Sequence, residues 1–214
     1  MLHVDITLTD IALAVECAVF CTLLLRRNTG DPSARRVFIA LFAALATASL
    51  FGAIWHGALS DQDTSVARVI WFAAMCTLAL SATALWYLAA ILLQTGFWPA
   101  AFRIFAWLQL VVQILISALL SDAFGVAALG VLPPLVIVTI LYFRHYSATR
   151  APLALTGALG FALAILSGLV VVFEVSLHPR WASPFAVYHV LQFIALWLVF
   201  LSVPAVVLRQ PETA

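Results

Sequence analysis

Residues 37–59 read VFIALFAALATASLFGAIWHGAL, and this stretch decides the class of fold. It contains no Asp, Glu, Lys or Arg, and His56 is its one ionisable side chain. An α-helix that crosses the hydrocarbon core of a membrane needs roughly 20 predominantly apolar residues. The stretch therefore predicts a transmembrane helix. Comparable apolar stretches, separated by short polar connectors, occupy the rest of the chain.

Seven such stretches predict an all-α, polytopic membrane protein, a seven-transmembrane-helix bundle that forms a single domain over residues 1–214. Composition supports this class, because 65% of the residues are hydrophobic and 9% are charged, whereas soluble domains carry about 25% charged residues. The predicted spans are residues 9–26, 37–59, 67–93, 99–120, 123–143, 152–175 and 184–207.

The basic residues exclude two classes of function. All ten of them are arginine, and a retinal Schiff base needs a lysine amine. No basic patch is present that could grip nucleic acid. Membrane lipids are the expected partners, because the chain is predicted to lie in the membrane. Whether it forms a homo-oligomer stays open.

The arginines also predict the orientation, because cytoplasmic loops of membrane proteins are enriched in Lys and Arg. An N-terminus outside and a C-terminus in the cytoplasm puts eight arginines inside and two outside. The outer pair is Arg68 and Arg180. The inner ones are Arg26, Arg27, Arg35, Arg36, Arg103, Arg144, Arg150 and Arg209.

Local features lead to further expectations. Thr9 or Asp10 is the expected N-cap of the first helix, and Pro133-Pro134 should kink the fifth. Gln109 and Gln113, one turn apart, are expected to pack against another helix. An aromatic belt at the membrane interfaces is expected from Trp55, Trp71, Trp98 and Trp181.

Four ionisable residues stand out inside the predicted spans: Glu16, His56, Glu174 and His189. Such residues are costly in a membrane and usually face the bundle interior or a cavity. At about 1.5 Å per residue, Glu16 and His189 lie about 10 Å below the outer ends of their helices, and His56 and Glu174 about 5 Å. All four therefore belong to the outer half of the membrane.

Two imidazoles and a carboxylate at similar depth suit a zinc ion, with His56, His189 and Glu16 as the predicted ligands. Catalytic zinc takes three protein ligands and a water whose pKa falls to about 7. The resulting hydroxide could attack a lipid amide or ester from the outer leaflet. Glu16 and Asp61 are the candidate catalytic carboxylates. Asp63, Glu174 and His178 compete for the same role. A structural interpretation stands beside this one, in which His56 and Glu16 form a polar contact between helices.

These residues resemble the CREST superfamily of seven-helix membrane proteins, which includes alkaline ceramidases, adiponectin-type receptors and bacterial members. In that family, histidines near the end of helix two and the start of helix seven hold zinc on the side that carries the N-terminus. His56, within Gly52-Ala-Ile-Trp-His-Gly57, matches the first, and His189, within Val187-Tyr-His-Val-Leu-Gln192, matches one of the second. Glu16 resembles the acidic residue of the first helix.

The resemblance implies a zinc-dependent lipid hydrolase in the bacterial inner membrane. The chain departs from the family pattern at Gly52, where the family has serine, and at Phe185 and Phe193, which flank His189 where a second histidine is expected. These departures favour a lipid-binding or receptor-like bundle that has lost the metal. A third hypothesis is a haem protein with His56 and His189 as axial ligands. Whether the protein is an enzyme stays open.

Overall fold

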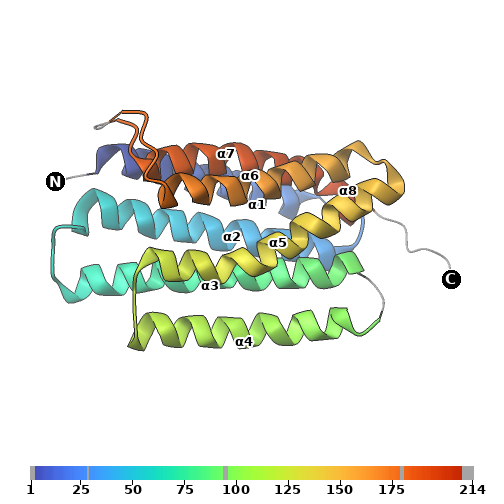
Figure 1. Cartoon of the computed structure of the whole chain (residues 1–214), viewed down its shortest axis with the longest axis horizontal. Coiled ribbons are helices and arrows are strands. Elements are labelled where there is room, and N and C mark those ends of the chain that lie inside the picture. The colour runs from blue at the N-terminus through green and yellow to red at the C-terminus, as the bar shows by residue number, and fades with distance from the viewer. Residues whose placement is uncertain (1–2, 28, 94–95, 179–180, 209–214) are drawn as a thin grey trace.

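Figure 1 shows the computed structural model, which describes residues 3–27, 29–93, 96–178 and 181–208. These residues form seven helices that are long and apolar enough to cross a membrane, so the expected all-α architecture is confirmed. The helices are α1 (Val4–Arg26), α2 (Pro32–Ile54), α3 (Ser65–Leu93), α4 (Trp98–Leu119), α5 (Phe124–Thr149), α6 (Pro152–Val172) and α7 (Pro184–Ser202). A π-helical turn, η1 (Trp55–Leu59), extends α2, and α8 (Pro204–Val207) follows α7.

Six of the helices form a closed ring. Neighbours pack together in the order α1, α2, α3, α5, α6 and α7, and α7 packs against α1. Helix α4 lies outside the ring, mainly against α3, along the bottom of the view in Figure 1. Six helices are therefore available to enclose an interior space.

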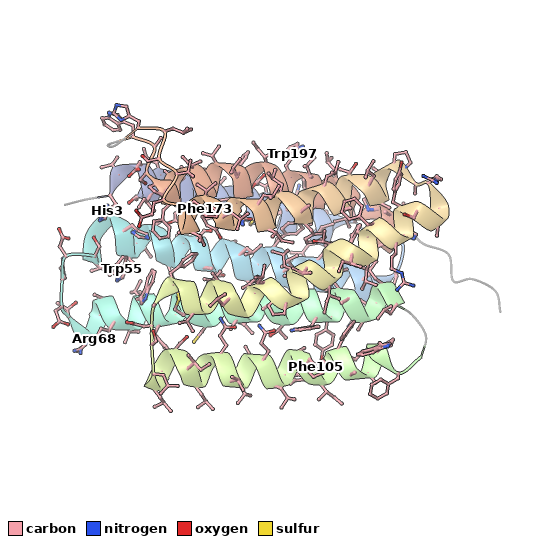
Figure 2. All side chains as sticks on the ribbon, viewed as in Figure 1. His3, Trp55, Arg68, Phe105, Phe173 and Trp197 are labelled. Atoms are coloured by element: carbon pink, nitrogen blue, oxygen red, sulfur yellow. The ribbon has the colours of Figure 1, made fainter. Side chains whose placement is uncertain are left out.

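The two ends of the bundle carry different side chains. We call the end where α1 and α7 begin the histidine end, because it holds His3 and His56; Figure 2 shows His3, Trp55 and Arg68 there. We call the opposite end the arginine end. Seven of the eight described arginines lie there, at the ends of helices: Arg26, Arg27, Arg35, Arg36, Arg103, Arg144 and Arg150. Arg180 and Arg209 lie outside the described residues.

Helix α1 begins at Val4, so the expectation that Thr9 or Asp10 caps it is wrong. His3 takes the N-cap position, and Thr9 Oγ1 lies 3.0 Å from the carbonyl oxygens of Asp5 and Ile6 within the helix. The Asp5 carboxylate accepts a hydrogen bond of 3.1 Å from the backbone N–H of Ser183, which holds the first turn against the start of α7. The earlier start places Asp10 inside the helix.

Other helix boundaries also differ from expectation for local reasons. Helix α2 begins at Pro32, because the side chain of Asp31 accepts a hydrogen bond from Ser33 N and caps the first turn. Helix α6 ends at Val172, before Glu174 adopts a left-handed backbone with φ of 51°. Glu174 is therefore an exposed loop residue, and its placement inside a span is wrong.

Pro134 of α5 leaves a backbone carbonyl to which α4 attaches. Pro134 has no N–H to donate to the carbonyl of Gly130, four residues earlier. Gln109 Nε2 from α4 donates to that carbonyl at 2.6 Å, and Gln113 Nε2 donates to Ala127 O at 2.9 Å. The expected packing role of both glutamines is confirmed. Figure 1 shows α5 running obliquely across the bundle.

Replacing Gln109 by Leu should weaken the attachment of α4. The substitution leaves the Gly130 carbonyl unpaired and removes the acceptor for the Trp86 indole N–H. We expect a loss of about 1–3 kcal/mol in the free energy of unfolding, measured by denaturant titration in detergent with circular dichroism. Gln62→Leu is the control, because Gln62 is exposed and bonds within its own turn. Equal effects of the two variants would contradict this role for Gln109.

Candidate functional site

The ring of helices encloses a cavity of about 410 Å³, within the range of roughly 300–1,000 Å³ that is usual for ligand pockets. All six ring helices and η1 line it, and α4 does not. The lining extends from Leu41 to His56 on α2 and η1, and from Phe185 to Val199 on α7. At about 1.5 Å per residue, the cavity is about 20 Å long. Its shape suits an extended chain.

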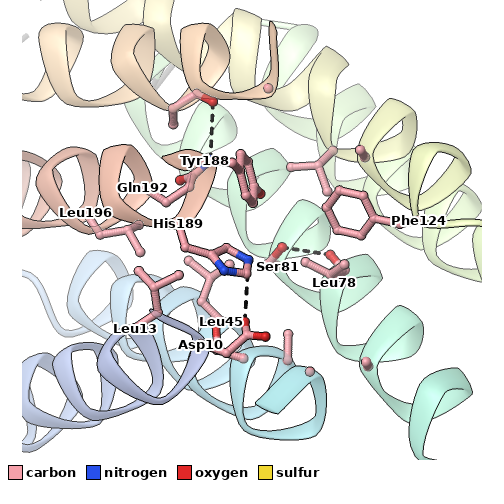
Figure 3. Close-up of a pocket in the computed structure, with 18 of the residues that line it drawn as sticks. Asp10, Leu13, Leu45, Leu78, Ser81, Phe124, Tyr188, His189, Gln192 and Leu196 are labelled. Atoms are coloured by element: carbon pink, nitrogen blue, oxygen red, sulfur yellow. Dashed lines mark hydrogen bonds and ion pairs between the residues drawn. The ribbon is translucent and has the colours of Figure 1, made fainter. Parts of the chain in front are cut away.

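The chemical character of the cavity changes along its length. Its ionisable side chains, Asp10, His56, Tyr188 and His189, lie toward the histidine end. The walls toward the arginine end are apolar, with Leu41, Leu85, Leu135, Phe161, Leu196 and Val199. Figure 3 shows His189 and Asp10 facing each other across the cavity wall between α7 and α1. The cavity is therefore amphipathic.

His189 is held by two neighbours on α1. Its Nε2 lies 3.5 Å from Asp10 Oδ1, and its Nδ1 lies 3.0 Å from Thr9 Oγ1. Both His189 and Asp10 are buried, with 8% and 4% of their surfaces exposed. The donor and acceptor roles in these two contacts follow the tautomer of the imidazole. His189 thus links α7 to α1 through Thr9 and Asp10.

Gly52 on α2 makes room for the Asp10 carboxylate. A Cβ atom at Gly52 would lie 2.9 Å from Asp10 Oδ2 and 3.2 Å from Oδ1. Among the described residues, Asp10 Oδ2 has no hydrogen-bond partner. The Asp10 carboxylate of α1 therefore fills the space that a side chain at position 52 would take. A buried polar atom without a partner is costly, so Asp10 is held at this position at the expense of stability.

His56 lies in the π-helical turn η1 and is half-buried at the cavity. π-helical turns interrupt α-helices frequently at functional sites. His56 Nδ1 is buried and has no partner among the described residues. Its ring makes edge contacts with Trp55, Trp71 and His3, with centroids 4.9, 6.2 and 6.0 Å apart. The expectation that His56 faces the interior agrees with this placement.

Trp55 and Trp71 do not belong to an outward aromatic belt, contrary to expectation. Both line the cavity, and their rings lie 4.5 Å apart. The indole N–H of Trp71 donates to Asp122 O at 2.7 Å, which fixes its orientation. Trp98 and Trp181 are exposed, with 57% and 68% of their surfaces accessible.

The predicted carboxylates lie elsewhere. Glu16 is buried, with 6% of its surface exposed, and its oxygens have no partner among the described residues, but it is not among the residues that line the cavity. Asp61 and Asp63 are exposed in the loop after η1, and His178 is exposed in the loop before α7. Gln192 also lines the cavity, and its Nε2 donates to Ser167 Oγ on α6 at 2.9 Å.

The predicted metal ligands are only partly brought together. His56 and His189 line the same cavity, and Glu16 does not. In the described part of the chain, no group of three or more His, Cys, Asp or Glu side chains is arranged to hold a metal ion. The predicted set of His56, His189 and Glu16 is therefore not brought together at the cavity. A haem would need a free nitrogen on each histidine, whereas both nitrogens of His189 have partners.

Sequence reasoning missed Asp10 as a site residue. A signal was present, since Ile6, Asp10, Leu13 and Cys17 follow the three-to-four spacing of a single helix face, and all four are buried. The assumed start at residue 9 concealed that spacing by placing Asp10 at the helix boundary.

The fold and the cavity define a seven-helix bundle of apolar helices with an internal amphipathic pocket. Within that class, the chain belongs to the family described as "Family of unknown function (DUF6962)", whose profile matches residues 6–207. No curated protein and no solved structure matches the chain.

Proposed function

We propose that the protein is an integral membrane protein that binds an amphipathic, lipid-like molecule inside its ring of helices. The observation that carries this proposal is the cavity of about 410 Å³, polar at the histidine end and apolar toward the arginine end. A ligand with one polar head and one long apolar tail matches that gradient. The apolar wall contributes about 25 cal/mol for each Å² of tail surface removed from water.

The exterior of the bundle supports residence in a membrane. Large apolar side chains are exposed on all the long helices, and on α4 they include Phe105, Trp107, Leu108, Val111 and Leu115. A soluble monomer rarely exposes apolar patches of this extent. The bacterial inner membrane remains our proposed location, by resemblance.

The arginine distribution supports an orientation with the histidine end outside and the arginine end in the cytoplasm. Cysteine labelling tests it in a background where Cys17, Cys21 and Cys76 are replaced by Ala. Asp63→Cys should react with a membrane-impermeant maleimide on intact cells, and Thr149→Cys only after permeabilisation. The reverse pattern would overturn the orientation.

Native mass spectrometry tests ligand binding directly. The protein is released from a neutral detergent after titration with dodecan-1-ol, a neutral molecule with a long tail. Binding inside the cavity predicts one saturable adduct per chain. Adducts that increase without saturation, or no adduct, would contradict the proposal.

A zinc-dependent lipid hydrolase of CREST type is the second candidate function. It is favoured by the placement of His56 and His189 at one cavity and by the unpartnered Nδ1 of His56. Elemental analysis of wild type, His56→Ala and His189→Ala, purified without chelators, distinguishes the two candidates. The binding function predicts zinc far below one ion per chain and equal in all three. About one zinc per chain, lost in both variants, would establish the second candidate instead.

A further inference from the structure

The polar end of the cavity carries a specific charge pattern. Among the described residues that line this end, Asp10 supplies a carboxylate and none is an Arg, and the chain has no lysine. An anionic head group such as a phosphate or carboxylate would meet no cationic side chain there. Bringing a second negative charge beside buried Asp10 would be strongly unfavourable. The charge pattern thus selects neutral or cationic head groups.

Asp10 lines the cavity, and one of its carboxylate oxygens has no hydrogen-bond partner among the described residues. Oδ1 faces Nε2 of His189, whereas Oδ2 is buried without a hydrogen-bond partner and lies against Gly52 at the cavity wall. Asp10 is 4% exposed, so competition from bulk water is weak. A donor that also carries positive charge forms the stronger hydrogen bond with a carboxylate.

Aromatic rings surround the same end of the cavity. Trp55 and Trp71 lie on one side, and Phe124, Phe185 and Tyr188 on the other. Because Trp71 uses its N–H to bond Asp122 O, it offers the cavity its ring and no donor. Aromatic faces attract cations, and tryptophan does so most strongly. These rings would stabilise a cation and add little for an alcohol.

We infer that the cavity selects an amphipathic amine in its ammonium form, with the head group between the Asp10 carboxylate and the aromatic rings and the tail toward Leu196. This inference rests on the proposed ligand-binding function. A cation beside the buried carboxylate favours the ionised form of Asp10. The contact of 3.5 Å between Asp10 Oδ1 and His189 Nε2 helps to hold the carboxylate in place.

Three probes with the same tail test the inference: dodecan-1-amine, dodecan-1-ol and dodecanoate, each titrated separately at neutral pH by native mass spectrometry. The expected result is binding of the amine at least about tenfold tighter than that of the alcohol, with dodecanoate weakest. In Asp10→Asn, which keeps the shape of the side chain, the ratio of amine affinity to alcohol affinity should fall to about one. Asp63→Asn, an exposed carboxylate outside the cavity, should keep the preference.

The outcomes separate the two proposals. Equal affinity for amine and alcohol in wild type, tighter binding of dodecanoate, or an undiminished preference in Asp10→Asn would overturn amine selection and leave cavity binding intact. The probe ratio in wild type decides the matter even where a variant does not fold. Absence of adducts with every probe would overturn both amine selection and the proposed function.

Discussion

Gly168→Phe is expected to reduce ligand binding by about tenfold to a hundredfold while the bundle stays folded. Gly168 lies on α6 and lines the cavity, and a Cβ atom built there meets no atom within 4 Å. A phenyl ring at this position extends into cavity space that the ligand would fill. Overlap with a ligand costs about 1–3 kcal/mol or more, and about 1.4 kcal/mol corresponds to a tenfold change in affinity.

Gly125→Phe is the matched control for this substitution. A Cβ atom at Gly125 also meets nothing within 4 Å, but Gly125 is exposed and does not line the cavity. Binding of dodecan-1-ol is measured for both variants by native mass spectrometry, with circular dichroism as the folding check. Unchanged binding in folded Gly168→Phe would place the ligand outside the cavity.

Gly157→Ala is expected to lower the free energy of unfolding by about 1–3 kcal/mol, although alanine is the better helix former. A Cβ atom at Gly157 would lie 2.3 Å from Tyr142 Cε1 and 2.7 Å from Ser202 Oγ. Tyr142 is fully buried and Ser202 Oγ lies 3.4 Å from its hydroxyl, so the ring has no space into which to move. The clash should disturb the junction of α5, α6 and α7.

Two further variants identify the cause of this loss. Gly168→Ala lies on the same helix in open space, so it should be neutral or slightly stabilising. Tyr142→Leu combined with Gly157→Ala should lose less than the sum of the single effects, because the smaller side chain removes the clash. Denaturant titration in detergent gives the comparison. Full additivity would show that the Tyr142 contact is not responsible.

The sequence was sufficient for the number and type of the helices, because a run of about 20 apolar residues has few alternatives to a membrane-crossing helix. The helix boundaries were harder to predict. Helix α1 has no capping hydrogen bond from its N-cap side chain, so nothing in its sequence marked Val4 as the first residue. Helix α5 continues to Thr149, past the predicted end at residue 143, because its last turns stay helical beyond the apolar stretch.

The candidate site was predictable only in part. The placement of His56 and His189 near the same end of the bundle followed from the direction of their helices and the rise of about 1.5 Å per residue. The partner of His189 did not, because the pairing with Asp10 depends on how α1 packs against α7 and on the early start of α1. Glu16 was the predicted acid of the first helix, but it lies six residues after Asp10 and does not line the cavity. The position of α4 outside the ring likewise depends on how the helices pack, which their sequences do not show.

Photo-crosslinking tests the central claim, an amphipathic ligand inside the ring of helices, most directly. The probe is dodecan-1-ol with a diazirine near the end of its tail, used with the protein in lipid vesicles. We predict labelled peptides around Leu85, Phe161 and Leu196, suppressed by excess dodecan-1-ol and absent in Gly168→Phe. Labelling concentrated on the exposed face of α4, around Trp107 and Val111, and unaffected by competitor or by Gly168→Phe, would contradict the account.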